Sequence, residues 1–426
     1  MSLRIRITYQ DLWFKCCGLS IHIQVFKKGS VCMILVGIDV GKLSHMFCIM
    51  DSTNGEILVK PSSFQNNREG FELLLNKMKS YSKDKMLIGM EDTGHYHFNL
   101  LKFLLDCGYT VALINPITTD LARKMQLCNT KDDALDTLTI CDVISSNLHK
   151  KGYRISKVNN FALYEQKRLT REHHDLKEEL NSLANKLQKC IDIVFPEFNS
   201  LFKSKLGSLY MKLLKTFGSA DAIAHANIRK IRKCFDSCKR GRPLSLTAEM
   251  LKETARNSIG FPSNAEVIEM RHLIDRINLI KKQISDVDKK IEEFSIQNNS
   301  PILSIPGISH FSGTSILAEF GDFSNYLKAS QIIKFAGVSP SKYKSSQFEA
   351  QHMAITKKGS CYLRKTLYQV ILPVIQFNPV FYNYYHLKLS QGKGHRCAQG
   401  HCVRKLLRVI FHLVTTNNFF DPSLLR

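Results

Sequence analysis

Short apolar runs alternate with segments of helical spacing over residues 34–148, and this alternation restricts the possible folds more than any other feature. Apolar runs bounded by turn residues are typical of strands, which we expect at residues 34–39, 45–50, 56–59, 86–90 and 111–114. Apolar residues recurring every three or four positions indicate helices, which we expect at residues 68–81, 98–107 and 134–148. The predicted order of elements is therefore β-β-β-α-β-α-β-α.

This order is that of the ribonuclease H fold. Three meandering strands and the α/β units after them form one mixed sheet with helices on its faces. The first domain is predicted to cover residues 33–155. Residues 1–32 carry no clear helical or strand period, so we expect an N-terminal extension without regular structure.

Two long helices are predicted in a middle segment that covers residues 156–300. The first, over residues 160–195, has apolar residues seven apart at Leu176, Leu183 and Cys190, and again at Leu180, Leu187 and Val194. The second, over residues 266–295, has a cleaner repeat at Met270, Ile277, Ile284 and Ile291, and at Leu273, Ile280, Val287 and Phe294. Such heptad seams form coiled coils. We expect either an antiparallel pair or a contact between subunits.

The last segment, residues 301–426, is predicted to be mainly α-helical, with helices at residues 360–376 and 396–417. The sequence from Ile305 to Ile308, followed by an apolar helix, resembles a helix-hairpin-helix turn, in which backbone N–H groups can hold a phosphate. The fold class is therefore α/β plus α: a ribonuclease H-like N-terminal domain, coiled-coil helices with a basic helical insert, and a mainly α C-terminal domain.

The chain carries a large positive charge. Its 426 residues include 60 Lys and Arg against 37 Asp and Glu, a formal net charge of +23. Residues 1–150 contribute only +2, whereas residues 151–426 contribute +21. Such a surplus indicates a polyanionic partner, of which nucleic acid is the commonest. The basic insert, which includes Arg240 and Arg242, is predicted to contact phosphate, with a solvated charged surface as the alternative.

The thirteen cysteines show no framework spacing, nothing resembles a signal peptide, and no apolar run reaches the roughly 18 residues of a membrane span. We therefore expect free thiols, a reduced cytoplasmic compartment and no membrane partner. Cys234 with Cys238, and the group from His395 to Cys402, lack the paired spacing of a strong zinc site.

Four acids lie where the predicted fold brings its elements together. Asp39 ends the first strand, Glu91 follows the fourth, and Asp133 and Asp136 share one face of the last helix of the domain. Because close carboxylates repel one another unless cations lie among them, this group predicts a site for two Mg²⁺ ions that act in phosphate chemistry. Each acid also has an ordinary alternative, such as a helix cap for Asp133 or a solvated strand end for Glu91.

A second candidate site is the serine pair Ser345 and Ser346, between basic and glycine-containing segments. A serine hydroxyl near arginines and lysines can attack a phosphodiester, although such serines more often only contact phosphate. Candidate phosphate contacts are Lys357, Lys358 and Arg364, together with Lys131 beside the acids.

In combination these motifs resemble the insertion-sequence one-ten/eleven-eleven family of transposases, over about residues 33–420. The front motifs are Gly37-Ile38-Asp39-Val40, Glu91-Asp92-Thr93-Gly94-His95-Tyr96, Asn115-Pro116 and Thr130-Lys131-Asp132-Asp133-Ala134-Leu135-Asp136. The back motifs are Pro306-Gly307-Ile308, Ala336-Gly337-Val338-Ser339-Pro340, Ser345 and Lys358-Gly359-Ser360 with Leu363-Arg364. The family usually has Ser-Gly at Ser345-Ser346 and often Ala at Thr137.

The resemblance implies a RuvC-like domain in which Asp39, Glu91, Asp133 and Asp136 hold Mg²⁺, and a C-terminal domain in which Ser345 is the nucleophile. It implies a homo-oligomer, dimer or tetramer, that recombines element-end and target DNA under the guidance of a noncoding bridge RNA. It also implies a bacterial, nucleoid-associated location. The alternatives are a RuvC-like structure-specific nuclease that forms no covalent intermediate, and an inactive nucleic-acid-binding remnant.

Overall fold

The computed structural model describes residues 33–92, 94–125, 132–149, 161–203, 205–238, 245–341 and 354–424, with the backbones of six short strands outside these ranges. The chain divides into two compact units, each assembled from separate stretches of sequence. Unit 1 comprises Met1–Tyr164, Phe320–Gly359 and Arg404–Thr416. Unit 2 comprises Glu165–Glu319, Ser360–Val403 and Asn417–Arg426. The four consecutive domains that we expect from the sequence stay a prediction.

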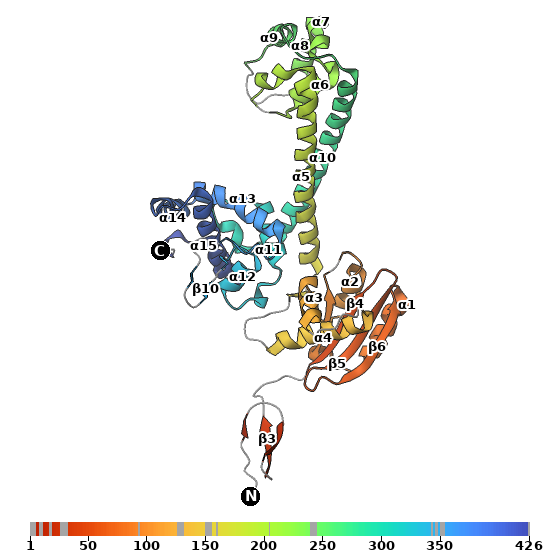
Figure 1. Ribbon diagram of the computed structural model, residues 1–426. Helices are drawn as coiled ribbons and strands as arrows, with labels where there is room; N and C mark the ends of the chain where they lie inside the picture. The colour runs from red at the N-terminus through yellow and green to blue at the C-terminus, as the bar shows by residue number, and fades with distance from the viewer. Residues whose placement is uncertain are drawn as a thin grey trace. The chain divides into compact units, whose positions relative to one another are not determined.

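A six-stranded mixed sheet is the centre of unit 1 (Figure 1). Its strands are β4 (Ile34–Val40), β5 (Ser44–Asp51), β6 (Ile57–Gln65), β7 (Met86–Glu91), β8 (Val111–Ile114) and β9 (Ser156–Val158), in the order β6-β5-β4-β7-β8-β9. The strands β4, β5 and β6 form an antiparallel meander, whereas β7 and β8 continue from β4 in parallel. This topology confirms the predicted ribonuclease H-like fold.

Helices cover both faces of this sheet. The helices are α1 (Arg68–Met78), α2 (Phe98–Asp106), α3 (Pro116–Met125) and α4 (Asp133–His149). Because side chains alternate along a strand, Val36 and Ile38 pack with α1 and α2 on one face, while Leu35 and Leu87 pack with α4 on the other. The sequence did not predict α3 or the edge strand β9, which pairs antiparallel with β8 beyond the predicted domain end at residue 155.

The N-terminal extension differs from expectation. Three strands, β1 (Arg6–Ile7), β2 (Leu12–Cys16) and β3 (Leu19–Val25), form a small sheet in the order β1-β3-β2. The sequence did not predict these three short strands. The reason is visible in β3, where Leu19, Ile21 and Ile23 alternate with polar residues, as in a strand with one apolar face.

Two long helices, α5 (Phe161–Val194) and α10 (Asn264–Asn298), form an antiparallel pair within the chain. Three contacts fix their direction. The Asn298 side-chain amide donates to Gln166 Oε1 over 3.0 Å, His173 Nε2 lies 3.1 Å from Asp288, and Arg276 lies 3.8 Å from Glu179. Of the two arrangements that the heptads allow, the structure thus shows the intrachain pair, and the apolar seams of both helices are largely buried in it.

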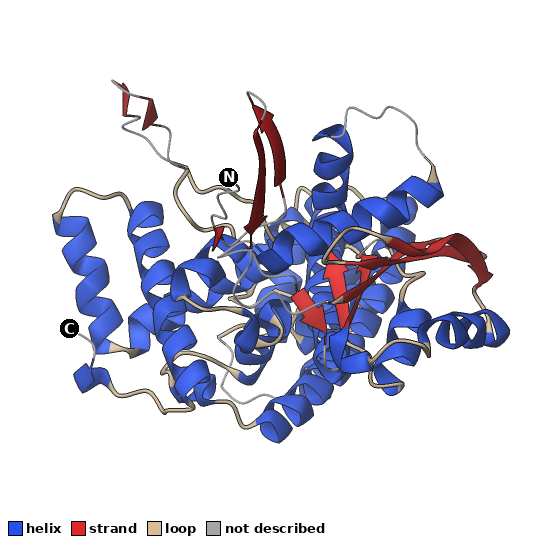
Figure 2. Ribbon diagram, turned by 90° about the horizontal axis from the view of Figure 1, so that it is seen from below, coloured by secondary structure: helices blue, strands red, loops and turns tan. Residues whose placement is uncertain are grey.

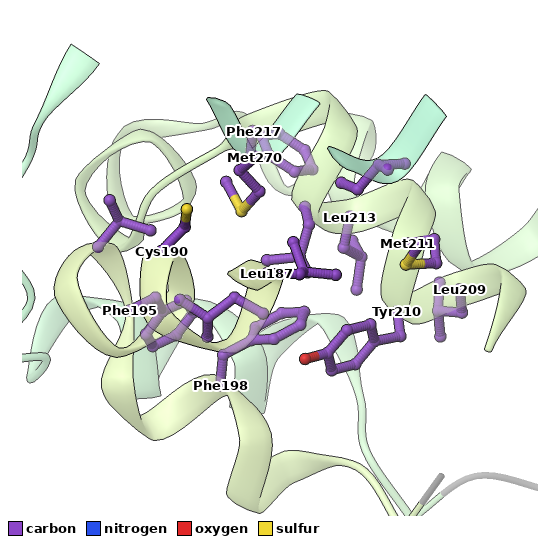
Figure 3. Packing of buried hydrophobic residues seen from close by; sticks show 14 of the residues in the cluster. Leu187, Cys190, Phe195, Phe198, Leu209, Tyr210, Met211, Leu213, Phe217 and Met270 are labelled. Carbon is purple, nitrogen blue, oxygen red and sulfur yellow. The ribbon is translucent and has the colours of Figure 1, made fainter. Parts of the chain in front are cut away.

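Four short helices gather where α5 ends and α10 begins (Figure 1). These tip helices are α6 (Ser208–Phe217), α7 (Ala220–His225), α8 (Ile228–Asp236) and α9 (Ala248–Arg256). Figure 3 shows their shared core, in which Phe195 and Phe198 pack near Tyr210 and Leu213, with Met270 of α10 beside Phe217. The aromatic rings of Phe198 and Tyr210 lie 5.0 Å apart between centroids. The predicted basic helical insert is therefore a packed subdomain rather than an extended loop.

The C-terminal third is mainly helical, as predicted. It contains α11 (His310–Phe320), α12 (Ala329–Phe335), α13 (Cys361–Phe377), α14 (Pro379–Ser390) and α15 (His395–Thr416). A short hairpin of β10 (Lys344–Ser345) and β11 (Phe348–Glu349) accompanies these helices. Figure 2 colours the helices of the whole chain blue and its strands red. Across the described residues, no helix is long and apolar enough to cross a membrane.

Candidate active site

Two of the predicted acids extend from neighbouring parallel strands. In the parallel pair of β4 and β7, Ile38 lies opposite Met90. Asp39 and Glu91 are the next residues along these strands, so both leave the sheet at the carboxyl ends of β4 and β7. Loops and helix ends converge at this edge of a parallel sheet, which is where ligand sites commonly form.

The other two acids come from the first turns of α4, which lies close against the sheet. Gly37 of β4 permits this closeness, because a Cβ there would overlap the Thr137 carbonyl oxygen of α4. Gly89 of β7 serves in the same way, because a Cβ there would overlap the Ile144 side chain. The start of α4, with Asp133 and Asp136, is thereby held beside the strand that carries Asp39.

The electrostatics of Asp39 reflect both its burial and the other three acids. Burial, followed by the negative charges of Asp133, Asp136 and Glu91, raises the pKa of Asp39 to about 6. A carboxyl group has so high a pKa when its negative charge is poorly compensated. The cluster therefore has an excess of negative charge, which a cation would neutralise.

Helix α3 supplies neutral and positive partners to this cluster. Thr119 is buried, with 4% of the residue exposed. Its hydroxyl donates to Glu91 Oε1, and the hydroxyl oxygen lies 2.9 Å from the Pro116 carbonyl oxygen. Arg123 lies with one guanidinium nitrogen 3.5 Å from Asp136 and another 3.7 Å from Asp120. These contacts fix the direction of Glu91 and give Asp136 a partial counter-charge.

The donor set fits a hard divalent cation. Carboxylate oxygens are the ligands that Mg²⁺ prefers, and the negative charges of the other three acids contribute to the raised pKa of Asp39. Within the described ranges, no three His, Cys, Asp or Glu side chains are already close enough together to hold a metal ion. The carboxylates would therefore draw together on binding, as mutual repulsion predicts for an acidic cluster without a cation.

The structure places Ser345 in the hairpin of β10 and β11, where its backbone pairs with that of Phe348. On either side of this hairpin along the chain, Pro340 pairs with Ile355, and the backbone N–H of Ser341 donates to the Ala354 carbonyl oxygen over 2.8 Å. We call these paired residues and the hairpin the serine ribbon. The side chain of Ser345 and the whole of Ser346 lie outside the described residues.

Two glycine-containing motifs that are distant in the sequence meet at the base of this ribbon. The backbone N–H of Lys357 donates to the Gly337 carbonyl oxygen over 3.0 Å. Both Gly337 and Gly359 have positive φ angles, and a Cβ on either would overlap the backbone of the other segment, so larger residues do not fit. The exposed Lys357 and Lys358 therefore have a defined position beside the ribbon that carries Ser345.

The remaining predicted phosphate contacts are only partly visible. Arg364 is partly buried in the first turn of α13, whereas Lys131, Arg240 and Arg242 lie outside the described residues.

Near the acids in the sequence, His97 is buried and its Nε2 lies 3.2 Å from the Tyr164 hydroxyl, while His95 is exposed. Sequence reasoning missed Thr119 and Arg123, because no helix was expected between the strand at residues 111–114 and the helix at residues 134–148. Proline at the first position of a helix was the available signal.

Comparison with known proteins agrees with this geometry. Residues 36–196 match the family model of DEDD transposases of the IS110 type, and residues 299–386 match the model of the IS116/IS110/IS902 transposase family. The chain belongs to the IS110 family of transposases. The first model spans the four acids and the second spans Ser345, so the IS110-family motifs lie in both halves of the chain. The protein is thus a transposase, an enzyme of DNA recombination.

Two curated relatives from Streptomyces coelicolor are similar along nearly their whole length. The mini-circle putative transposase for IS117 is 22% identical over 405 residues, which cover 92% of this chain and 96% of the relative. An uncharacterized 43.6 kDa protein of insertion element IS110 is 20% identical over 398 residues, with the same coverage. Among solved structures, Thermus thermophilus RuvC in complex with a Holliday junction substrate is 12% identical, with a TM-score of 0.23, over 30% of this IS110-family chain and 99% of RuvC.

Proposed function

We propose that this transposase cuts and rejoins DNA strands through a Mg²⁺-dependent acidic site and a serine nucleophile. The observation that supports the proposal is the position of Asp39 and Glu91 at the ends of neighbouring strands beside the first turns of α4, together with the raised pKa of Asp39, to which the charges of Asp133, Asp136 and Glu91 contribute after burial. Asp39, Glu91, Asp133 and Asp136 would hold the metal. When bound, Mg²⁺ supplies a Lewis acid that stabilises negative charge on the reacting phosphate oxygens.

The proposed nucleophile is the hydroxyl oxygen of Ser345. It forms a bond to the phosphorus of a DNA phosphodiester while the bond from that phosphorus to the leaving sugar oxygen breaks. The serine proton passes to a base or to solvent, and the leaving oxygen takes up a proton. A sugar hydroxyl of a second strand then attacks the same phosphorus and releases the serine. The number of phosphodiester bonds is conserved, so strand exchange needs no energy source.

Basic residues would position the DNA for these steps. Lys357 and Lys358 lie exposed at the base of the ribbon that carries Ser345, where ammonium groups can contact the phosphate backbone. We assign Arg364, Lys131, Arg240 and Arg242 the same role from their positions in the sequence. Such contacts give affinity without sequence preference, because every nucleotide presents the same phosphate.

The proposal includes a noncoding guide RNA and assembly as a dimer or tetramer. Residues 151–426 carry a net charge of +21, which is more than one DNA duplex needs at a single site and suits a complex of RNA with two DNAs. A guide of this kind selects the target by base pairing, while the protein contacts mainly the backbone. Association with bacterial DNA in the cytoplasm follows from this activity. Because α5 and α10 bury their seams in each other, assembly would use other surfaces.

Covalent trapping tests this function. The full-length protein is incubated with element-end DNA, the flanking noncoding RNA and Mg²⁺, then denatured and examined for DNA attached to protein. Wild type, Ser345→Ala, the adjacent control Ser346→Ala and the acidic-site variant Asp39→Asn are compared. We expect an adduct with wild type and Ser346→Ala, and none with the other two variants or after chelation of Mg²⁺.

Other outcomes identify which part is wrong. An adduct that survives in Ser345→Ala but not in Ser346→Ala moves the nucleophile by one residue. Free cut ends without any adduct indicate a plain nuclease that uses only the four acids. Cleavage that persists in Asp39→Asn refutes the acidic site. Binding without either product, with the guide RNA present, shows an inactive binder.

A further inference from the structure

The tip helices α6 to α9 lie in a part of the chain that neither family model covers. The models end at residue 196 and resume at residue 299. Within the intervening segment, residues 197–262 hold 13 Lys and Arg against 5 Asp and Glu. A subdomain with its own packed core and this charge imbalance has a surface that is available for a separate task.

One basic surface is the outer face of α8. Its inner residues Ile231, Cys234 and Phe235 are buried in the core of the tip helices. The outer face carries four exposed cations: Arg229, Lys230, Arg232 and Lys233. Residues three and four apart lie side by side on a helix, so these four form one continuous strip.

Most of this strip is available to a ligand. Arg232 forms an ion pair with Glu249 of α9 over 2.5 Å, and Lys230 Nζ lies 5.6 Å from the centre of the Phe217 ring. For Arg229 and Lys233, the described residues include no acidic group within ion-pair distance. Exposed Asp236 lies three residues after Lys233 on α8 and offsets part of the charge, whereas Arg229 and Lys233 remain accessible to a phosphate that replaces their counterions.

A second feature is a hollow of about 670 Å³ between α6 and α10. Lys212, Lys215 and Lys281 line it together with Ser208, Thr216 and Asn278, and with the apolar residues Leu206, Met211 and Ile274. Partial burial lowers the pKa of Lys281, whose ammonium group donates to the Leu206 carbonyl oxygen over 2.5 Å. Lys212 and Lys215 are exposed residues, so their ammonium groups are accessible to an anion from solvent.

The charges around the hollow remain positive after their neighbours are included. Lys215 forms an ion pair with Asp275, whereas Lys212 donates to the Ser237 hydroxyl over 2.6 Å and has no acidic partner within ion-pair distance among the described residues. Ser237 is the C-terminal cap of α8, so Lys212 links the hollow to the strip on α8. The hollow and the strip thus form one basic surface on the tip helices.

We infer that this basic tip surface, formed by the strip on α8 and the lysines of the hollow, binds the phosphate backbone of a nucleic acid. It is a binding surface in addition to the proposed catalytic residues. Phosphate is the anion that repeats at a spacing able to use a row of cations, and hydroxyl and amide groups in the hollow add hydrogen bonds to phosphate oxygens. The ligand is duplex RNA or duplex DNA, which share this backbone chemistry.

The salt dependence of binding by the full-length protein tests the inference. The tip variant combines Lys212→Gln, Arg229→Gln and Lys233→Gln. The control variant removes the same charge from exposed positions on α5 and α10 by Lys186→Gln, Lys282→Gln and Lys289→Gln. Each protein is titrated with duplex RNA and duplex DNA of one sequence, about 30 base pairs long, over a range of salt concentrations.

For the tip variant we expect the slope of log affinity against log salt to fall by about 2 to 3, because each phosphate contact contributes about 0.9. Affinity at about 0.1 M salt should fall at least tenfold, while the control variant keeps the wild-type slope. A change with RNA alone identifies RNA as the ligand, and a change with DNA alone identifies DNA. Equal losses in the tip and control variants overturn the inference and leave a solvated charged surface. Because binding needs no chemistry, this result is independent of the covalent-trapping experiment.

Discussion

At the scale of single residues, Thr119 is the clearest addition to the acidic cluster. Its hydroxyl donates to Glu91 while its own helix start holds it in place through the Pro116 carbonyl. Partners of this kind orient a metal-binding carboxylate, and their loss typically costs 10- to 100-fold in metal affinity or activity. We therefore expect Thr119→Val to raise the Mg²⁺ concentration for half-maximal cleavage by about 10- to 100-fold.

The matched control is Thr118→Val, one residue earlier and exposed to solvent. The conservative variant Thr119→Ser should restore the wild-type Mg²⁺ requirement, because it keeps the hydroxyl. An unchanged Mg²⁺ titration in Thr119→Val, with cleavage lowered equally at all concentrations, contradicts a positioning role and indicates a packing defect.

The four acids of the candidate site could be found from the sequence because each ends or begins an element of a fold that has a distinctive order. Thr119 and Arg123 could not be found in this way. Threonine and arginine on a surface helix usually face solvent, and only the position of α3 over the end of β7 brings them to Glu91 and Asp136.

At the scale of elements, the position of α4 depends on glycines in the strands beneath it. We expect Gly37→Ala to destabilise the fold by about 1–3 kcal/mol, because its methyl group overlaps the Thr137 carbonyl and pushes α4 outward. Displacement of α4 also moves Asp133 and Asp136 away from Asp39, so cleavage should fall even at temperatures where the variant is folded. Chemical denaturation and a cleavage assay on the same protein measure both effects.

A suitable control is Gly394→Ala, since no atom outside its immediate neighbours lies within 4 Å of a Cβ there. If Gly37→Ala is as stable and as active as this control, the close approach of α4 is not what holds the acids together.

Where the sequence predicted a helix or strand, most boundaries agree with the structure to within a few residues, because each of these elements has a strong apolar period. The sequence could not decide what α5 and α10 pack against. A heptad seam has the same pattern whether its partner helix is in the same chain or in another subunit. Contacts between polar residues, such as His173 with Asp288, distinguish the two arrangements, and the sequence pattern does not reveal them. The strands β1 and β2 were missed because a strand of two or five residues is too short to show a recognisable alternation of apolar and polar residues.

At the scale of the whole molecule, acid should weaken unit 2 through a buried histidine. Burial, followed by the positive charges of Lys365 and His173, lowers the pKa of His174 to about 4. The Nε2 atom of His174 lies 2.9 Å from the Thr366 hydroxyl, inside the packing of α5 against α13. Because the ordinary pKa is about 6.5, the unfolded chain takes up a proton more readily than the folded chain between pH 6.5 and 4.

The stabilising contribution of His174 is therefore complete above pH 6.5 and is lost as the pH falls toward 4. We expect the free energy of unfolding to decrease over this interval by on the order of 2 kcal/mol more in wild type than in His174→Gln. Denaturant titrations at several pH values measure the difference, with exposed His272→Gln as the control. An equal pH dependence in all three proteins rules out this origin of acid sensitivity.

The antiparallel pairing of α5 with α10 also makes the middle of the chain an adjustable arm. Seven residues inserted into each helix would keep both seams in register and carry the tip helices about 10 Å further out, since each helical residue adds 1.5 Å. An insertion of five residues would instead turn the seams away from each other. Related transposases could therefore differ in reach by whole heptads while the acids and the serine ribbon stay unchanged, so that the span of the bound nucleic acid evolves separately from the chemistry.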